Sequence, residues 1–404
     1  MNTPLRDALL PYAPRDAVPA KRTSTVQVLA FLVLCGFGGA VIGSLLAMVR
    51  HGFGGGWLGL WLADVPSMQP GWVVLFTALM AWPHVLVHET GHALAGLARG
   101  MQPLAFGVGP WRWERSLDRW RLLRAPRVRG ISGFAILLPR GARGQSRLDQ
   151  VAYLAGGPFA NFVTLALALG LLPLTTHAPL AGAFLAGTAI GAAFVGLVNL
   201  VPFSTAGWRS DGRNLVDLMR RSPEAETARR VRETLGLTMA GVRPRDWPAS
   251  SLPPLSVHSG RAPTMLDTNA ASQVLTHAID AQDAALARAA ARALAAGHAH
   301  VPEALRPHIA IGMAAFAACI ERDADLLAAW RPLCEGGLFD LATARTWLDA
   351  ELAAMRADAE ASRAAIATAR ALRDRVPDAL SRQLLDERLD ALEARLASPP
   401  RHDS

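Results

Sequence analysis

The sequence predicts a mostly helical protein in two unlike parts. The first is an all-α membrane domain of about four transmembrane helices, with a small β element in one loop; the second is a C-terminal all-α soluble domain. Hydrophobic residues make up 51% of the 404 residues, and the mean hydropathy is positive, which is more apolar than an average soluble protein. The long apolar runs lie between residues 25 and 203, and the remainder is rich in Ala, Arg, Asp and Glu.

These patterns divide the chain into four segments. We expect a cytoplasmic N-terminal segment over 1–24, a transmembrane domain over 25–219, a helical stretch with a Pro-rich linker over 220–263, and a cytoplasmic helical domain over 264–404. Only three cysteines occur, without CxxC spacing, so neither a disulfide framework nor a cysteine metal site is expected.

Four apolar runs are long enough to cross a bilayer as helices, which takes about 20 residues. They are Thr25 to Val49, Gly71 to Ala98, Val151 to Leu174 and Leu180 to Phe203. The first is longer than a signal-peptide core, and no A-x-A type cleavage site follows it. We therefore expect it to remain as an uncleaved helix.

The arginines predict the orientation of these helices. Eleven lie from Arg99 to Arg147, whereas the turn over residues 175–179 contains neither Lys nor Arg. Because cytoplasmic loops are enriched in Lys and Arg, both termini and the basic loop are expected in the cytoplasm. Lipid headgroups and topology also account for the net charge of +8, so nucleic-acid binding is not expected. The lack of eukaryotic-type targeting and the Arg and Ala usage favour a multi-pass protein of a bacterial inner membrane.

Two further patterns lie outside the apolar runs. The stretches Leu104 to Trp113 and Arg127 to Pro139 have alternating or β-branched residues with Gly breaks, which predicts the β element. In Ala281 to Ala296, Glu303 to Glu321 and Leu341 to Arg373, apolar residues recur at three- and four-residue steps, which is typical of helices. An array of helical hairpins that binds a cytoplasmic protein partner and a plain solvated bundle both fit this pattern.

The second apolar run contains an H-E-x-x-H motif formed by His88, Glu89 and His92. On a helix the two imidazoles lie one turn apart on one face, at the spacing that holds one Zn²⁺, and the glutamate can act on a water molecule. A charged carboxylate at the centre of a membrane helix costs about 2.5–3.5 kcal/mol, so polar packing alone does not explain the motif. His84 shares this face but lies too far from His92 to bind the same ion, and we expect it to support or pack against the site.

A zinc hydrolase needs a third protein ligand. From Gln150 to Val216 the only acidic side chain is Asp211, just beyond the cytoplasmic end of the fourth run. The H-E-x-x-H helix approaches its cytoplasmic end at the same depth. Asp211 is therefore the expected third ligand, and a helix N-cap is its alternative role.

Two amides, Asn161 and Asn199, lie inside the third and fourth apolar runs. An amide in a transmembrane helix needs a hydrogen-bond partner. Each asparagine therefore either ties helices together or contacts the substrate backbone or the developing oxyanion.

Taken together, these motifs resemble those of the site-2 protease family of intramembrane zinc metalloproteases. That family combines H-E-x-x-H on one core helix with N-x-x-P-x-x-x-x-D-G near the end of another. Asn199, Pro202, Asp211 and Gly212 match the ordered residues of the second motif, although eight residues rather than four separate the Pro from the Asp. The segments AGGPFANF and FGVGPW are similar to the family's G-P-x-x-N helix and to the segment after its zinc-binding helix. The resemblance covers residues 71–215.

The resemblance implies a zinc metalloendopeptidase that hydrolyses peptide bonds in or near transmembrane segments of membrane proteins, in regulated proteolysis. His88, His92 and Asp211 would hold Zn²⁺, Glu89 would be the catalytic base, and a β element beside the metal would hold an unwound substrate. The expected partners are a membrane-protein substrate with a transmembrane helix and the lipid bilayer. The alternatives are a non-proteolytic membrane scaffold that recruits cytoplasmic partners through its helical C-terminal domain, and a zinc-handling transporter. A scaffold does not need Glu89, and a transporter normally spreads ionisable groups across several helices.

Overall fold

A computed structural model describes most of the chain and divides it into two compact units. The described residues are 8–11, 70–117, 119–124, 132–140, 145–205, 208–255 and 262–397. The predicted first span, Thr25 to Val49, lies outside them. One unit, here called the apolar unit, comprises residues 18–91 and 157–199, and the large unit comprises residues 1–17, 92–156 and 200–404. The described part is mostly helical with a small sheet, which confirms the predicted helical character and the small β element.

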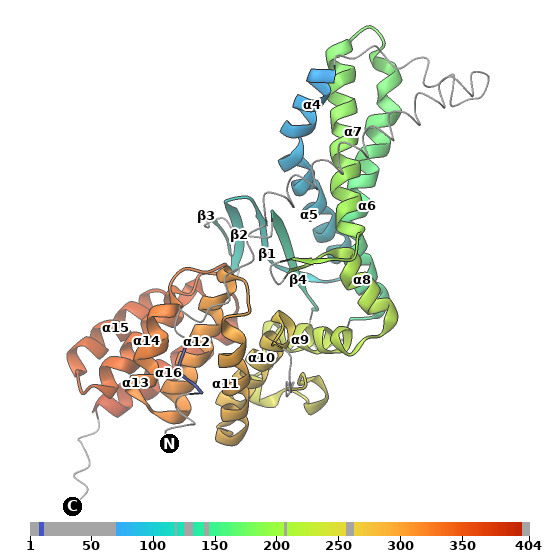
Figure 1. The fold of residues 1–404 in the computed structure, drawn as a ribbon. Coiled ribbons are helices and arrows are strands. Elements are labelled where there is room, and N and C mark those ends of the chain that lie inside the picture. The colour runs from blue at the N-terminus through green and yellow to red at the C-terminus, as the bar shows by residue number, and fades with distance from the viewer. Residues whose placement is uncertain are drawn as a thin grey trace, which may run out of the picture. The chain divides into compact units, whose positions relative to one another are not determined.

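Four helices contribute to the apolar unit: α4 (Pro70–Leu79), α5 (Ala81–Ala98), α6 (Arg147–Leu171) and α7 (Pro179–Leu200) (Figure 1). Small residues on α7 let these helices approach closely. A Cβ atom at Gly187 would lie 2.8 Å from the Cβ atom of Phe76 on α4, and one at Gly191 would lie 2.6 Å from the ring of His84 on α5.

Among the described residues, three helical segments are long and apolar enough to cross a membrane: Arg147–Thr175, Pro179–Leu200 and Glu303–Glu321. The third packs inside the large unit, where half of its apolar window is buried. Helices α4 and α5 pass the same test only as a pair, bent by 46°.

This bend divides the apolar run from Gly71 to Ala98, which is predicted from the sequence to be one span. The break falls at Met80, and Pro83 follows in the first turn of α5. Proline has no N–H to donate to the carbonyl four residues earlier, and its ring crowds that carbonyl. The helix therefore changes direction just before the H-E-x-x-H motif.

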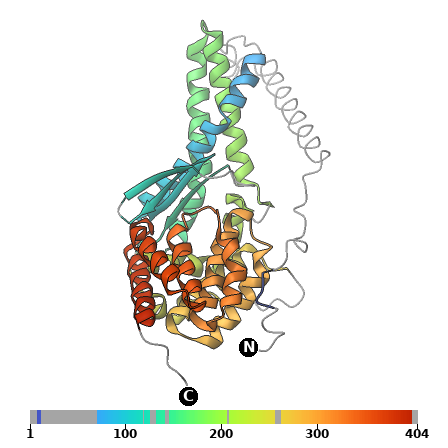
Figure 2. The same ribbon diagram turned by 90° about the vertical axis from the view of Figure 1, so that its left-hand side faces the viewer.

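In the large unit, an antiparallel sheet of four strands follows α5, in the order β3-β2-β1-β4 (Figure 2). Phe106 on the central strand β1 lies opposite Trp113 on β2 and Ala135 on β4. The stretch predicted from Leu104 to Trp113 is two strands, because the chain reverses at Gly109, where φ is +61°. The strands are β1 (Gln102–Val108), β2 (Trp111–Ser116), β3 (Arg119–Arg124) and β4 (Gly133–Leu138).

Helices α10 to α16 of the large unit surround one core that contains the fully buried side chains of Phe316, Trp330 and Trp347, and α8 and α9 precede them in the chain. Two pairs, α10 with α11 and α14 with α15, are joined by short connections, as in helical hairpins. The helices are α8 (Asp211–Arg220), α9 (Pro223–Met239), α10 (Met265–Ala281), α11 (Ala284–His298), α12 (Arg306–Phe316), α13 (Ala324–Trp330), α14 (Ala342–Met355), α15 (Ala359–Ala371) and α16 (Ala379–Ala397).

The Pro-rich linker is fixed to these helices. Arg243 donates hydrogen bonds to both carboxylate oxygens of Asp280 on α10 and reaches Glu387 on α16. Trp247 is buried and stacks on the ring of His277. The described part of the linker is therefore a structured connection between α9 and the helical core.

The sheet and the helical core meet through backbone and ionic contacts. The Leu117 N–H donates to the carbonyl of Val376, at 3.0 Å. Asp340, before α14, accepts hydrogen bonds from Arg121 on β3 and from Arg375. These contacts join the end of β2 and the outer strand β3 to the helical core, and β4 is the outer strand at the other end of the sheet.

The buried His298 makes the helical core sensitive to acid. Burial lowers the pKa of this imidazole to about 4, and the charge of Arg306 acts in the same direction. In the unfolded chain the pKa is about 6.5, so between those values the unfolded state binds a proton that the folded state excludes. Stability should therefore fall as the pH drops from about 6.5 to 4, by at most about 1.4 kcal/mol per pH unit. Urea unfolding at pH 7 and pH 5 should show a smaller loss for His298→Gln than for the parent; equal losses would contradict this assignment.

Candidate metal centre

Helix α5 presents two histidines to the site from consecutive turns. His88 and His92 are both almost fully buried, and the four-residue step places them on the same face. Gly96, one turn later, lets other elements approach α5, because a Cβ atom there would lie 2.7 Å from the Leu137 side chain on β4. The small residue therefore brings the sheet against the helix that carries the histidines.

Asp211 reaches the site from the first turn of α8. Its Oδ2 atom lies 3.2 Å from Nε2 of His92. The N-cap of α8 is Ser210, whose side chain accepts from the Arg213 N–H at 3.1 Å. The alternative role considered for Asp211, the N-cap of a helix, is thus wrong, because Ser210 holds that position.

A hairpin accounts for the long interval between Pro202 and Asp211. The strands β5 (Ser204–Thr205) and β6 (Trp208–Arg209) pair antiparallel. At its base the Ser210 N–H donates to the Phe203 carbonyl at 3.1 Å. Because Phe203 and Ser210 are held together, the chain continues into α8 from a point close to Phe203.

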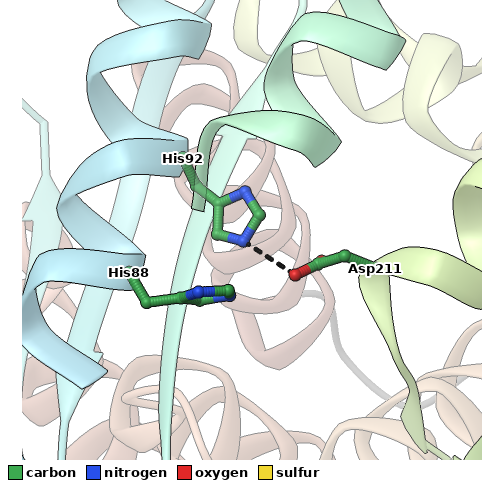
Figure 3. A group of neighbouring side chains, drawn as sticks. All are labelled: His88, His92 and Asp211. Atoms are coloured by element: carbon green, nitrogen blue, oxygen red, sulfur yellow. Dashed lines mark hydrogen bonds and ion pairs between the residues drawn. The ribbon is translucent and has the colours of Figure 1, made fainter. Parts of the chain in front are cut away.

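The three side chains converge on one point (Figure 3). One ligand atom each from His88, His92 and Asp211 lies within 4.8 Å of the others. Together they offer two imidazole nitrogens and one carboxylate oxygen. Zn²⁺ in hydrolases uses such sets and keeps one position for water, and non-haem Fe²⁺ uses a similar set.

The surroundings of His88 point its Nε2 lone pair toward the metal position. The Asn161 amide nitrogen donates to the backbone carbonyl of His84 at 3.2 Å. Its Oδ1 atom therefore faces Nδ1 of His88, at 2.9 Å, and accepts from it. With its proton on Nδ1, the imidazole keeps a lone pair on Nε2, as metal-bound histidines require.

His92 is held in the same tautomer by a backbone group. Its Nδ1 lies 2.7 Å from the carbonyl oxygen of Tyr153 on α6, and a carbonyl can only accept a hydrogen bond. The Nε2 lone pair then faces the Asp211 carboxylate. Two acceptors at 3.2 Å repel unless a positive charge lies between them, so this pair is suited to share a proton or a metal ion.

The other predicted residues lie as follows. Glu89 is buried next to His88. Both ends of the Asn161 amide bond to α5, so Asn161 ties α6 to α5 and orients His88. The Asn199 amide donates to Val195 within its own helix at 2.9 Å.

Sequence reasoning missed the part played by Tyr153, because any residue can supply a backbone carbonyl. It also missed Ser210 as the cap of α8. The only signal for Ser210 was a residue type that favours N-caps, immediately before Asp211.

Gly212, directly after Asp211, is required by a close approach of backbone. A Cβ atom at this position would overlap the carbonyl group of Leu200 at the end of α7. The Gly212→Ala variant should therefore displace the start of α8 and weaken metal binding at least about tenfold, the lower end of the effect of disturbing a ligand's support. Gly170→Ala on α6, where nothing lies within 4 Å, is the control. Equal metal affinity in the two purified variants would contradict this role of Gly212.

The chain was also compared with known proteins. No family model, no curated protein and no solved structure matches it.

Proposed function

We propose that this chain is an intramembrane zinc metalloendopeptidase. It would hydrolyse peptide bonds in or near transmembrane segments of membrane proteins, as the resemblance to site-2 proteases implies. The observation that carries the proposal is the contact between His92 and Asp211, which are 119 positions apart in the sequence. The only acid between Gln150 and Val216 lies beside the H-E-x-x-H motif. The hairpin over residues 203–210 absorbs the extra residues in the second motif, which supports the resemblance.

A membrane location is supported by the apolar side chains that the helices expose. Val74 on α4, Leu167 on α6 and Leu180 on α7 are 68%, 61% and 53% exposed. Large apolar patches on a protein surface mark contacts with lipid or with other proteins. We infer a multi-pass protein of a bacterial inner membrane from the Arg and Ala usage and the lack of eukaryotic-type targeting. Both termini would lie in the cytoplasm, because the arginines flank the apolar runs on one side.

The residues present fit zinc hydrolysis. A bound Zn²⁺ supplies a Lewis acid for the substrate carbonyl and lowers the pKa of water. Glu89 takes a proton from the attacking water and later delivers it to the leaving amine. Water is thus added across the C–N bond, which gives one carboxylic acid and one amine. A purely structural metal site does not need this buried base.

The sheet offers a place for an unwound substrate. A peptide bond inside a helix is not open to attack, so the segment must be held extended, and an edge strand can do this by main-chain hydrogen bonds. The strand β4 ends the sheet, and the Tyr153 hydroxyl donates to the carbonyl of Ala135 on β4. The same tyrosine accepts from His92 through its backbone. Tyr153 thus contacts both the edge strand β4 and the proposed metal ligand His92.

The proposal is tested by comparing membrane-protein fragments in cells that carry the parent protein or Glu89→Gln. Mass spectrometry should find fragments whose new ends lie in or near a transmembrane segment, and these should be missing with Glu89→Gln. The exposed Glu360 supplies a matched control, since Glu360→Gln should leave the fragments unchanged. If parent and Glu89→Gln cells contain the same fragments, the protease proposal fails and the scaffold alternative gains support.

A further inference from the structure

A short N-terminal segment lies inside the core of the C-terminal helices. Leu9 is fully buried there, whereas its neighbours Ala8 and Leu10 are exposed. In both ribbon views the segment is the short dark blue piece beside the orange helices (Figures 1 and 2). One leucine therefore acts as an anchor in an apolar pocket.

A polar contact fixes the backbone of this leucine. Trp330 at the end of α13 is also fully buried, and its indole Nε1–H donates to the Leu9 carbonyl at 2.8 Å. His298 packs against the same indole: the two rings meet edge-to-face, with their centroids 5.2 Å apart. A buried indole N–H without an acceptor is costly, so the pocket requires a carbonyl as well as an apolar side chain.

The anchor and the pocket come from distant parts of the chain. They are 321 positions apart, and every buried residue of this core other than Leu9 lies between residues 271 and 392. A leucine in a pocket with a main-chain hydrogen bond is how a folded domain holds a short peptide. The contact therefore has the form of a domain with a bound ligand.

We propose that the C-terminal helical domain is a peptide-binding module whose site is filled by the chain's own segment around Leu9. The peptide is recognised by one buried leucine side chain and by its carbonyl group. Another leucine-bearing peptide reaches the pocket only by displacing the N-terminal segment. The chain's own segment therefore blocks the site. This binding requires neither the metal centre nor proteolysis.

The test uses a fluorescein-labelled peptide with the sequence of residues 3–14. Fluorescence anisotropy measures its binding to the purified full-length protein and to two opened forms, one lacking residues 1–17 and one carrying Leu9→Asp. A tethered segment competes at an effective concentration on the order of millimolar. The opened forms should therefore bind the peptide at least about tenfold more tightly than the intact protein.

Matched peptides identify the anchor. The peptide with Leu9→Asp should not bind, and the peptide with Leu10→Ala should bind as well as the parent peptide. In an opened form, Trp330→Phe removes the N–H but keeps a ring, and should weaken binding. The proposal is overturned if both opened forms bind the parent peptide no more tightly than the intact protein does. It is also overturned if the Leu9→Asp and Leu10→Ala peptides bind alike, or if both opened forms lose the cooperative unfolding of the helical domain. The last result would make the segment part of the fold and not a ligand.

Discussion

Glu89→Gln is expected to bind zinc as the parent does and to cleave a membrane substrate at least about 100-fold more slowly, the lower range for loss of a general base. The amide has nearly the shape of the carboxylate but cannot take a proton from water. The histidines on either side, His88 and His92, keep their hydrogen bonds to Asn161 and to the Tyr153 carbonyl. Folding and metal content should therefore be preserved while the chemistry is lost.

The measurement is single-turnover cleavage by purified protein in detergent, with zinc determined by mass spectrometry in the same samples. Glu360→Gln, a change of the same kind at an exposed position, should cleave at the parent rate. Cleavage by zinc-loaded Glu89→Gln at the parent rate would remove Glu89 from the mechanism.

Asp211→Ala is expected to lose zinc. Loss of a residue that only supports a ligand typically lowers metal affinity 10- to 100-fold. Loss of a direct ligand should lower zinc affinity by at least the upper end of that range, about 100-fold. Without the carboxylate, the Nε2 atom of His92 faces no negative group from α8. Cleavage should fall with the zinc content.

The control for this variant is Asp149→Asn. Asp149 lies in the first turn of α6, is partly exposed, and pairs with Arg99, whose Nε atom is 2.6 Å from its Oδ1 atom. Zinc is measured after gel filtration in metal-free buffer, and circular dichroism checks that the helices remain. If Asp211→Ala keeps the zinc content of the parent, Asp211 is not a ligand.

Much of the fold and the site was open to prediction because the deciding signals are local. The four-residue step between His88 and His92 follows from helix geometry alone. Asp211 could be found by elimination, since an apolar region offers few acids. The number of residues between Pro202 and Asp211 is by itself a poor guide to their distance, because a hydrogen bond holds Phe203 and Ser210 together at the base of the hairpin.

Other features depend on contacts that no local pattern carries. The strand from Arg119 to Arg124 is rich in arginine and was assigned to a basic loop; its pairing with β2 and its contacts with the helical core stabilise it instead. The backbone carbonyl of Tyr153 could belong to any residue type. Leu9 lies in the predicted cytoplasmic N-terminal segment, outside the long apolar runs, and only the pocket beside Trp330 gives it a role.

Removal and return of the metal test the central claim most directly. The parent protein is stripped with a chelator, and cleavage of a transmembrane substrate is followed before stripping, after stripping and after addition of stoichiometric Zn²⁺. We predict that cleavage is lost with the metal and restored by zinc, while Glu89→Gln stays inactive at every stage. Cleavage that persists in the metal-free protein, or zinc-loaded parent protein that cuts no membrane substrate, would contradict the assignment of this site as a zinc peptidase centre.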